Sequence, residues 1–176
     1  MFRLLTNTIL LLTSLAATTQ TAYGQVPVRF KFDTARVYLN ENLDDFLSEI
    51  EKSHLSDYND KNAIPVSLKE QLELITHGFS MANPNEEYRC CCTSAQSLPY
   101  RKLLFLSLNK DLLIMTYLTG GIGVSTHILF VRFRDNNIQD IWNAQSFEEL
   151  KSKRNIIKFI KKNRNNLDRL HPNFDI

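Results

Sequence analysis

Two periods of apolar and polar positions divide the chain into predicted strands and helices. In segment 26–32 the apolar side chains occupy every second position, which predicts a half-buried strand. The next apolar positions follow the i, i+3, i+4, i+7 spacing of an amphipathic helix, and they are Leu43, Phe46, Leu47 and Ile50. Asn40 or Asn42 precedes them and can cap this helix.

A second helix is predicted from Ser67 and Glu70, which form a capping-box pair at its start. Its apolar positions are Leu68, Leu72 and Ile75, and Gly78 ends it. The polar segments 56–62 and 80–87 lie before and after this helix, and both are predicted as loops.

From residue 100 onward, strand-like apolar runs alternate with turn sequences; the runs are 103–108, 112–118, 127–133 and 138–142. Because the connections are short, neighbouring strands are expected to be antiparallel. Ser146 and Glu149 form a second capping box, which predicts a long helix reaching about Leu170. The sequence therefore predicts one α+β domain, in which two N-terminal helices and one long C-terminal helix pack on an antiparallel β-meander of about four to five strands.

Two of these runs, 103–108 and 112–118, are apolar on both strand faces. Strands of this kind lie centrally in a sheet and are covered on both sides. The predicted helices can cover one side. The other side then needs a second layer, a curled sheet that forms a pocket, or a partner subunit. A homodimer through this apolar sheet face is therefore one option.

The first 24 residues have the pattern of a secretory signal peptide. Arg3 supplies the positive start and an apolar run follows over 4–17, while Ala22 and Gly24 form the small-x-small exit before Gln25. The run is shorter than the roughly 20 apolar residues of a membrane-spanning helix. We therefore predict cleavage after residue 24 and export to the periplasm or the cell exterior, with no transmembrane segment left afterwards.

The composition is that of a globular protein, with 43% hydrophobic residues, 23% charged residues and a formal net charge of +2. It excludes a collagen-like, coiled-coil or disordered chain. The predicted mature domain, 25–176, has a net charge of +1 because the leader's single Arg is removed. This small sum conceals a polarised distribution. Seven acidic residues and one Lys lie between Glu41 and Asp60, whereas eight basic residues and one Asp lie between Lys151 and Leu170.

On the last predicted helix the basic side chains gather opposite the apolar ones. Five of them form a candidate partner-binding face: Lys151, Arg154, Lys158, Lys161 and Lys162. This face is either solvated or a docking surface for an acidic partner, an anionic glycan or a membrane surface. A third option is that the acidic first helix neutralises it within the fold. Nucleic acid is not expected, because no aromatic residues interleave with the basic ones and the leader predicts export.

Three consecutive cysteines, Cys90, Cys91 and Cys92, form the most unusual local motif. In an exported chain this odd number allows at most one internal disulfide, with a thiol left over or pairing between molecules. In a strand, Cys90 and Cys92 would share one face and could begin a site for copper(I) or zinc. A structural zinc site needs further ligands, which no pair at ligand spacing supplies. We predict buried or paired cysteines and no cofactor, with a metal or redox site and an exposed thiol as alternatives.

His127 is the candidate catalytic residue, because it alternates with apolar residues on one face of a predicted strand. A core or rim histidine with satisfied hydrogen bonds is one interpretation of this position. A catalytic base is the other, and it requires a partner within hydrogen-bond reach, such as Cys90, Cys92 or Asp140.

Three functions are consistent with these observations. The first is an exported non-enzymatic binding protein that engages a protein partner, such as an inhibitor, an immunity-type protein or a cell-envelope accessory domain. The second is a small exported hydrolase that uses His127 with a Cys or Asp partner. The third is a soft-metal or redox-responsive protein that uses Cys90–Cys92. The sequence favours the first, because it contains no complete catalytic motif.

Overall fold

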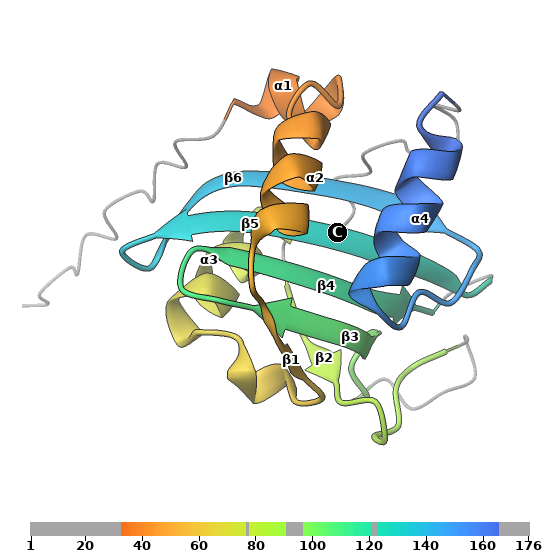
Figure 1. The fold of residues 1–176 in the computed structure, drawn as a ribbon. Coiled ribbons are helices and arrows are strands. Elements are labelled where there is room, and N and C mark those ends of the chain that lie inside the picture. Colours follow the sequence, from red (N-terminus) through yellow and green to blue (C-terminus); the bar gives the residue numbers. More distant parts are fainter. Residues whose placement is uncertain (1–32, 77, 91–96, 121–122, 166–176) are drawn as a thin grey trace, which may run out of the picture.

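The computed structural model describes residues 33–76, 78–90, 97–120 and 123–165. Over these residues the chain is α+β, with four α-helices packed on a six-stranded sheet (Figure 1). The predicted fold class is therefore confirmed. The segment 26–32, for which the sequence predicts a strand, lies outside the described residues.

The sheet is built on an antiparallel meander of four long strands. Its strand order is β1-β3-β4-β5-β6, and β2 pairs in parallel with β3. The strands are β1 (Ser56–Tyr58), β2 (Met81–Ala82), β3 (Arg101–Leu108), β4 (Leu112–Thr119), β5 (Ser125–Arg134) and β6 (Asn137–Ser146). Each of the four apolar runs predicted from the sequence forms one of the long strands, and each strand extends beyond its run.

Short polar turns connect the strands of the meander, as the sequence predicts. Asp135 and Asn136 join β5 to β6 with φ angles of 49° and 63°. These left-handed conformations are the ones that a tight hairpin turn requires, and Asp and Asn adopt them more readily than most residues. Between β3 and β4, the Asn109 side chain accepts hydrogen bonds from the backbone N–H groups of Asp111 and Leu112, at 2.9 and 2.8 Å.

The helices are α1 (Thr34–Tyr38), α2 (Leu43–Lys52), α3 (Val66–Thr76) and α4 (Lys153–Asn163), with a short 3₁₀ turn η1 (Lys61–Ala63) before α3. The first helix predicted from the sequence is α2, and all four of its predicted apolar positions are buried. The predicted end of α3 is also confirmed. Gly78 has a φ of 129° and its N–H donates to the carbonyl of Glu73, which closes the helix. No helix within the described residues has the length and apolar character needed to cross a bilayer.

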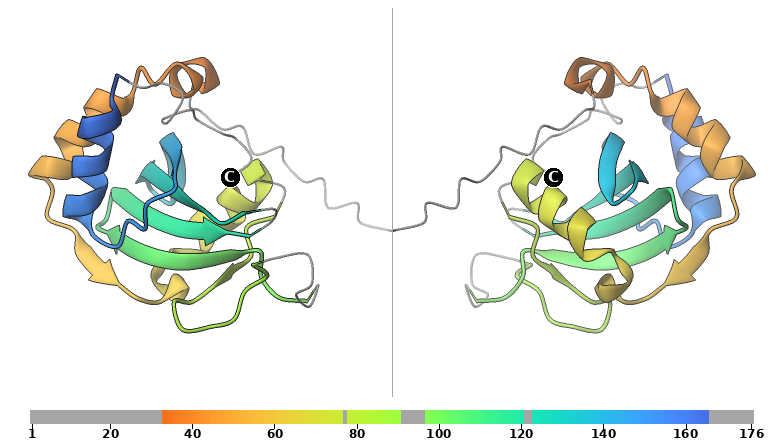
Figure 2. Two further views of the ribbon diagram at one scale, coloured as in Figure 1. Left: turned by 90° about the vertical axis from the view of Figure 1, so that its right-hand side faces the viewer. Right: turned by 90° about the vertical axis from the view of Figure 1, so that its left-hand side faces the viewer.

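Helices cover both faces of the sheet (Figure 2). α2 and α4 lie on one face, here called the α2/α4 face, and α3 lies on the opposite face, here called the α3 face. Along β4 the apolar side chains alternate between the two cores: Leu113 and Met115 join the α3-face core, whereas Leu112 and Ile114 join the α2/α4-face core.

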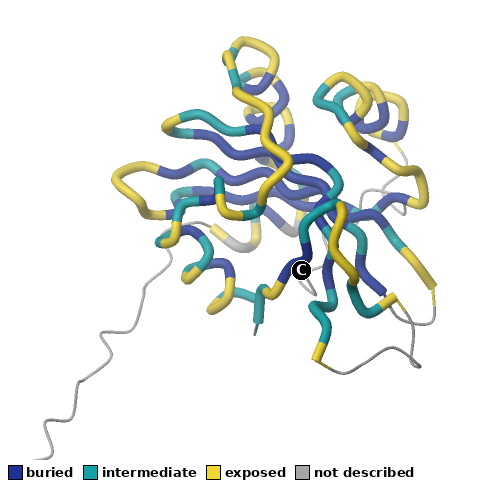
Figure 3. Tube along the Cα trace, turned by 90° about the horizontal axis from the view of Figure 1, so that it is seen from below, coloured by how far each residue is buried: buried dark blue, intermediate teal, exposed yellow. Residues whose placement is uncertain are grey.

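Both faces of the doubly apolar strands are therefore covered within the chain. The long strands are buried along most of their length, and the exposed residues gather on turns and on the outer sides of helices (Figure 3). The sheet does not need a partner subunit to cover it, and the homodimer remains a prediction.

Two segments predicted as loops contain short strands. β1 lies within 56–62 and β2 lies within 80–87, and both pair with β3. All three residues of β1 are exposed, so no alternation of apolar and polar positions marks this strand in the sequence.

The last helix begins later than its predicted start. β6 continues through Ser146, which pairs with Thr126 across the sheet. The Ser146 hydroxyl accepts a hydrogen bond from the Glu148 N–H in a local turn, and Ser152 caps α4 instead, accepting from the Asn155 N–H. Strand pairing thus outweighs the local capping pattern at Ser146. The described part of the helix ends at Asn163.

The capping box predicted for α3 is also wrong in position. The helix already begins at Val66, so Ser67 lies inside its first turn, where its carbonyl accepts a hydrogen bond from the Gln71 side chain. Pro65 precedes the helix, and its carbonyl accepts the first backbone bonds from Leu68 and Lys69. The predicted helix is therefore present, and it begins two residues earlier than an N-cap at Ser67 predicts.

Candidate functional site

His127 lies on β5, on the α3 face, and is only 5% exposed. Its Nε2 atom has three polar neighbours: the hydroxyl of Thr119 at 2.9 Å, the hydroxyl of Ser125 at 3.2 Å and the amide nitrogen of Gln145 at 3.3 Å. The ring of Tyr117 stacks on the imidazole, with centroids 5.2 Å apart and an interplanar angle of 12°. These five side chains lie on the adjacent strands β4, β5 and β6. Tyr117 and Gln145 each pair directly with His127, and Thr119 pairs with Ser125. Because directly paired residues point to the same face of a sheet, all five share one face.

Burial and a nearby cation keep His127 neutral. Burial, as the larger cause, and the positive charge of Arg101 together lower the pKa of His127 to about 4. Arg101 is held nearby by a hydrogen bond of 2.8 Å from Nη1 to the carbonyl of Gly78 and by the ring of Phe79, 5.3 Å away. An amide nitrogen can only donate, so with Gln145 in this orientation the imidazole accepts at Nε2 and carries its proton on Nδ1. This is the hydrogen-bonding arrangement of a core histidine.

The structure does not bring Asp140 to His127. Asp140 lies on the α2/α4 face, where its carboxylate accepts hydrogen bonds from Asn42 and Arg132 at 2.8 and 3.1 Å. The sheet therefore separates the carboxylate from the imidazole. Cys91 and Cys92 lie outside the described residues, so the hydrolase that pairs His127 with a cysteine stays a prediction.

Cys90 is exposed, and its backbone packs closely against the end of β4. A Cβ atom on Gly120 would lie 2.7 Å from the Cys90 Cα and 2.0 Å from the carbonyl oxygen of Arg89. Gly120 is therefore a position where only glycine allows the two segments to approach. Within the described part of the chain, no three His, Cys, Asp or Glu side chains are placed to hold a metal ion.

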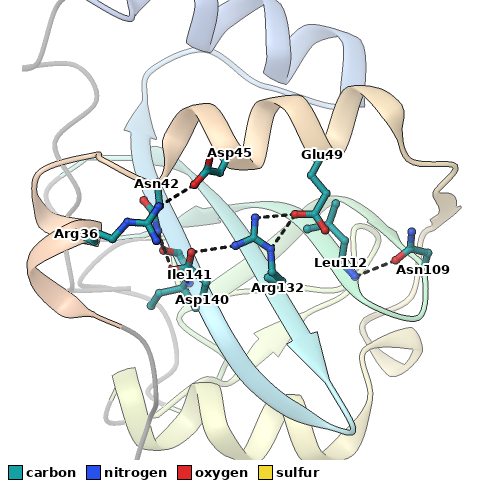
Figure 4. A network of polar contacts seen from close by, with 9 residues as sticks. All are labelled: Arg36, Asn42, Asp45, Glu49, Asn109, Leu112, Arg132, Asp140 and Ile141. Carbon is teal, nitrogen blue, oxygen red and sulfur yellow. Dashed lines mark hydrogen bonds and ion pairs between the residues drawn. The ribbon is translucent and has the colours of Figure 1, made fainter.

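A partly buried ionic network joins α2 to the sheet (Figure 4). Arg132 on β5 donates from Nε to Glu49 on α2 at 2.8 Å and from Nη1 to Asp140 on β6 at 3.1 Å. The guanidinium also lies 4.6 Å from the centre of the Phe46 ring. The network fixes one side of α2 on the sheet. The sequence did signal it, because Arg132 interrupts an otherwise apolar run.

Asn42 extends this network at the start of α2. It occupies the N-cap position, but its side chain caps no helical N–H. Its amide nitrogen donates instead to Asp140, at 2.8 Å, and to the carbonyl of Ile141, at 2.9 Å (Figure 4). The neighbouring candidate, Asn40, accepts a hydrogen bond from the indole of Trp142 at 2.6 Å. Both residues thus attach α2 to β6.

The acidic and basic helices lie side by side on the α2/α4 face (Figure 1). Lys161 pairs with Glu51 at 2.5 Å, and Arg164 pairs with Asp44. The sequence-based option in which the two helices neutralise each other within the fold is therefore realised for these cations. Lys151, another candidate for partner binding, pairs with Glu149, two positions before it in the chain.

The remaining three candidates form a strip along α4. Arg154, Lys158 and Lys162 are spaced by four residues and are all exposed. In the described part of the chain, none of them has an acidic partner within 4.0 Å. We call these three residues the basic strip.

A groove of about 760 Å³ runs beside the basic strip, and its lining residues are Glu51, Lys153, Arg154, Ile157, Lys158 and Lys161. Ile157 supplies an apolar contact there and packs against the α2/α4-face core. The strip and its groove form the candidate binding surface, because they combine exposed cations with a partly apolar depression.

A scan against protein-family models finds no match for this chain, and searches of curated proteins and of solved structures find no similar protein.

Proposed function

We propose that this chain is an exported, non-enzymatic binding protein that engages an acidic protein partner through the basic strip of α4. An inhibitor, an immunity-type protein and a cell-envelope accessory domain all fit this description. The observation that carries the proposal is that Arg154, Lys158 and Lys162 lie together on one exposed helix face without acidic partners in the described part of the chain.

The strip is costly for an isolated helix. Like charges four residues apart face each other, and each such pair destabilises a helix by about 0.2–0.5 kcal/mol. The chain contains acidic residues on α2 that could relieve this repulsion, but they pair with Lys161 and Arg164 instead. Carboxylates on a partner would relieve it and would accept charge-assisted hydrogen bonds from the guanidinium and ammonium groups. Charge complementarity of this kind favours specific and fast association.

Export is supported by the leader pattern of the first 24 residues, which precede the described part of the chain. An exported location determines which partners the basic strip meets: proteins, glycans and lipid surfaces of the cell envelope or its surroundings. Of these, an acidic protein surface fits best, because the groove beside the strip offers an apolar contact at Ile157 as well as charge.

Site-specific photo-crosslinking in the producing cells tests the proposal. A photoreactive lysine analogue at Lys158 of the full chain is expected to capture one discrete protein, which mass spectrometry identifies. The purified partner should bind the unmodified chain with an affinity that falls as salt rises. Reversal of all three charges of the basic strip to Glu should weaken this binding by roughly a hundredfold or more, since each charged contact contributes of the order of a kcal/mol.

A matched control reverses Lys69, Lys110 and Arg134 to Glu, which changes the net charge equally but leaves α4 intact. This control should bind as the unmodified chain does, within about threefold, because the three charges lie outside α4 and its groove and are screened by salt. Equal loss in both triple variants would show a non-specific charge effect and contradict the proposal. Capture of anionic lipid or glycan in place of a protein would also contradict it.

A further inference from the structure

Phe147 is the most exposed large apolar side chain of the described residues, at 98%. It lies in the connection between β6 and α4. Val124, 48% exposed, precedes β5 at the same end of the sheet, because Thr126 of β5 pairs with Ser146 of β6. Two exposed apolar side chains therefore lie at the end of the sheet from which the chain continues into α4.

The connection that carries Phe147 is held on both sides. Before α4, the Glu148 N–H donates to the Ser146 hydroxyl at 2.9 Å. Further along, the Leu150 carbonyl accepts a hydrogen bond of 2.6 Å from the Thr116 hydroxyl, and the Leu150 side chain is buried in the α2/α4-face core. The backbone on each side of Phe147 is thus fixed to the sheet, and the aromatic ring is presented to solvent by an ordered turn. An aromatic side chain in a fixed position loses little conformational entropy when it binds.

We propose that Phe147 is the aromatic anchor of the same protein interface whose charged part is the basic strip. The partner would then present an apolar pocket beside an acidic surface. This inference rests on the proposed function, and it adds the chemistry of the partner's surface. Only about six residues of chain separate Phe147 from Arg154, and a standard interface covers about 800 Å² on each partner, which accommodates both. Buried aromatic side chains at the centre and charged residues at the rim are the common arrangement of such interfaces.

The charges around Phe147 favour a protein over an anionic membrane. Its neighbours Glu148 and Glu149 are both exposed, and Glu149 pairs with Lys151. A membrane that carries anionic lipids would repel these carboxylates at the depth where Phe147 inserts. A protein pocket can instead enclose the ring and leave both carboxylates at its solvated rim.

Photo-crosslinking at Phe147 itself tests this inference. Benzoylphenylalanine at position 147 of the full chain keeps the aromatic character of the side chain and is introduced in the producing cells. A lysine-derived photoprobe at Lys158 is introduced in a second sample. Both are expected to capture the same protein. The peptide crosslinked from position 147 should lie in an apolar pocket of that protein, and the peptide crosslinked from Lys158 should lie in its acidic surface.

With the captured protein purified, Phe147→Ala should raise the dissociation constant by roughly tenfold or more, as loss of an aromatic anchor does. The slope of affinity against salt concentration should stay unchanged, because the ring carries no charge. Leu74→Ala is the matched control: Leu74 is 56% exposed on α3, and its removal should change the constant by less than about twofold. Reversal of the basic strip should lower both the affinity and the salt dependence.

The failures of the two proposals differ. Capture from Lys158 together with wild-type binding by the Phe147→Ala variant would overturn the anchor and leave the proposed function standing. Capture from position 147 with no effect of the basic-strip reversal would overturn the proposed function. Capture from neither position would overturn both. Crosslinking to a second copy of the chain would contradict a separate protein partner. Phe147-dependent sedimentation with phosphatidylglycerol vesicles would contradict it as well.

Discussion

At the scale of single residues, His127 makes the stability of the protein depend on pH. Its pKa is lowered to about 4 by burial and by Arg101, whereas an exposed histidine titrates near 6.5. Between these two pH values the unfolded chain binds a proton that the folded chain does not bind. The stabilisation is therefore fully present above about pH 6.5 and is lost as the pH falls to about 4, which amounts to about 3 kcal/mol.

The pH prediction is checked by urea denaturation between pH 4 and 7. The free energy of unfolding of a His127→Gln variant should fall less steeply with decreasing pH than that of the unmodified chain. His54→Gln is the control, since His54 is exposed, and it should keep the original slope. Equal slopes for all three proteins would show that His127 titrates normally in the fold.

Gly120 makes a second prediction at the residue scale. A Cβ atom there would lie 2.0 Å from the Arg89 carbonyl oxygen, so Gly120→Ala must displace the backbone that leads into Cys90. We expect a loss of about 1–3 kcal/mol in the free energy of unfolding, which is typical of overpacking. Gly123→Ala is the control, because nothing lies within 4 Å of its added methyl group. Similar denaturation midpoints for the two variants would contradict the close packing.

At the scale of elements, local patterns locate the strands and helices well but assign the role of individual polar residues poorly. The four runs of the meander were predictable because each is apolar and bounded by turn residues. Ser146 and Asn42 were misread for one physical reason. Each has the side chain of a helix cap, but a contact distant in the sequence decides its role: strand pairing with Thr126 keeps Ser146 in β6, and the Asn42 side chain donates to Asp140. Short-range patterns do not contain that information.

A substitution at Asn42 distinguishes its two possible roles, which are helix cap and hydrogen-bond donor to β6. If Asn42 acted as a cap, Asn42→Asp would be neutral, since Asp caps helices equally well. In the fold, however, a carboxylate at this position would face the carboxylate of Asp140 and the carbonyl of Ile141, which now accept hydrogen bonds from Asn42. We expect thermal and urea denaturation to show a loss of about 3 kcal/mol or more, because the added charge is buried without a partner.

The control for this prediction is a true cap. Ser152 accepts a hydrogen bond from the Asn155 N–H at the start of α4, so Ser152→Asp should change the free energy of unfolding by less than about 0.5 kcal/mol. A neutral Asn42→Asp would return Asn42 to the capping role and contradict its buried contact with β6.

At the scale of the whole molecule, some of the positive charge of the last helix is neutralised by α2 and some is not. The sequence alone does not separate these two parts. Helical periodicity places the basic residues on one face of α4, which was predictable from their spacing. Which of them are neutralised depends on the arrangement of α2 beside α4, a contact between residues more than 100 positions apart. Because α2 neutralises Lys161 and Arg164, the basic strip is left without an acidic partner in the described part of the chain.

Export, which the first 24 residues predict, is a property of the whole molecule that would set the environment of this surface. When the full chain is expressed in a secreting bacterial host, its exported form should begin at Gln25, as measured by intact mass and N-terminal sequencing. Ala22→Arg should block processing, because the exit requires a small side chain three positions before the cut. Tyr23→Arg, at the unconstrained position between the two small residues, should still be processed. An unprocessed wild-type chain that stays inside the cell would contradict export, and it would place Cys90 in a reducing compartment where disulfides are rare.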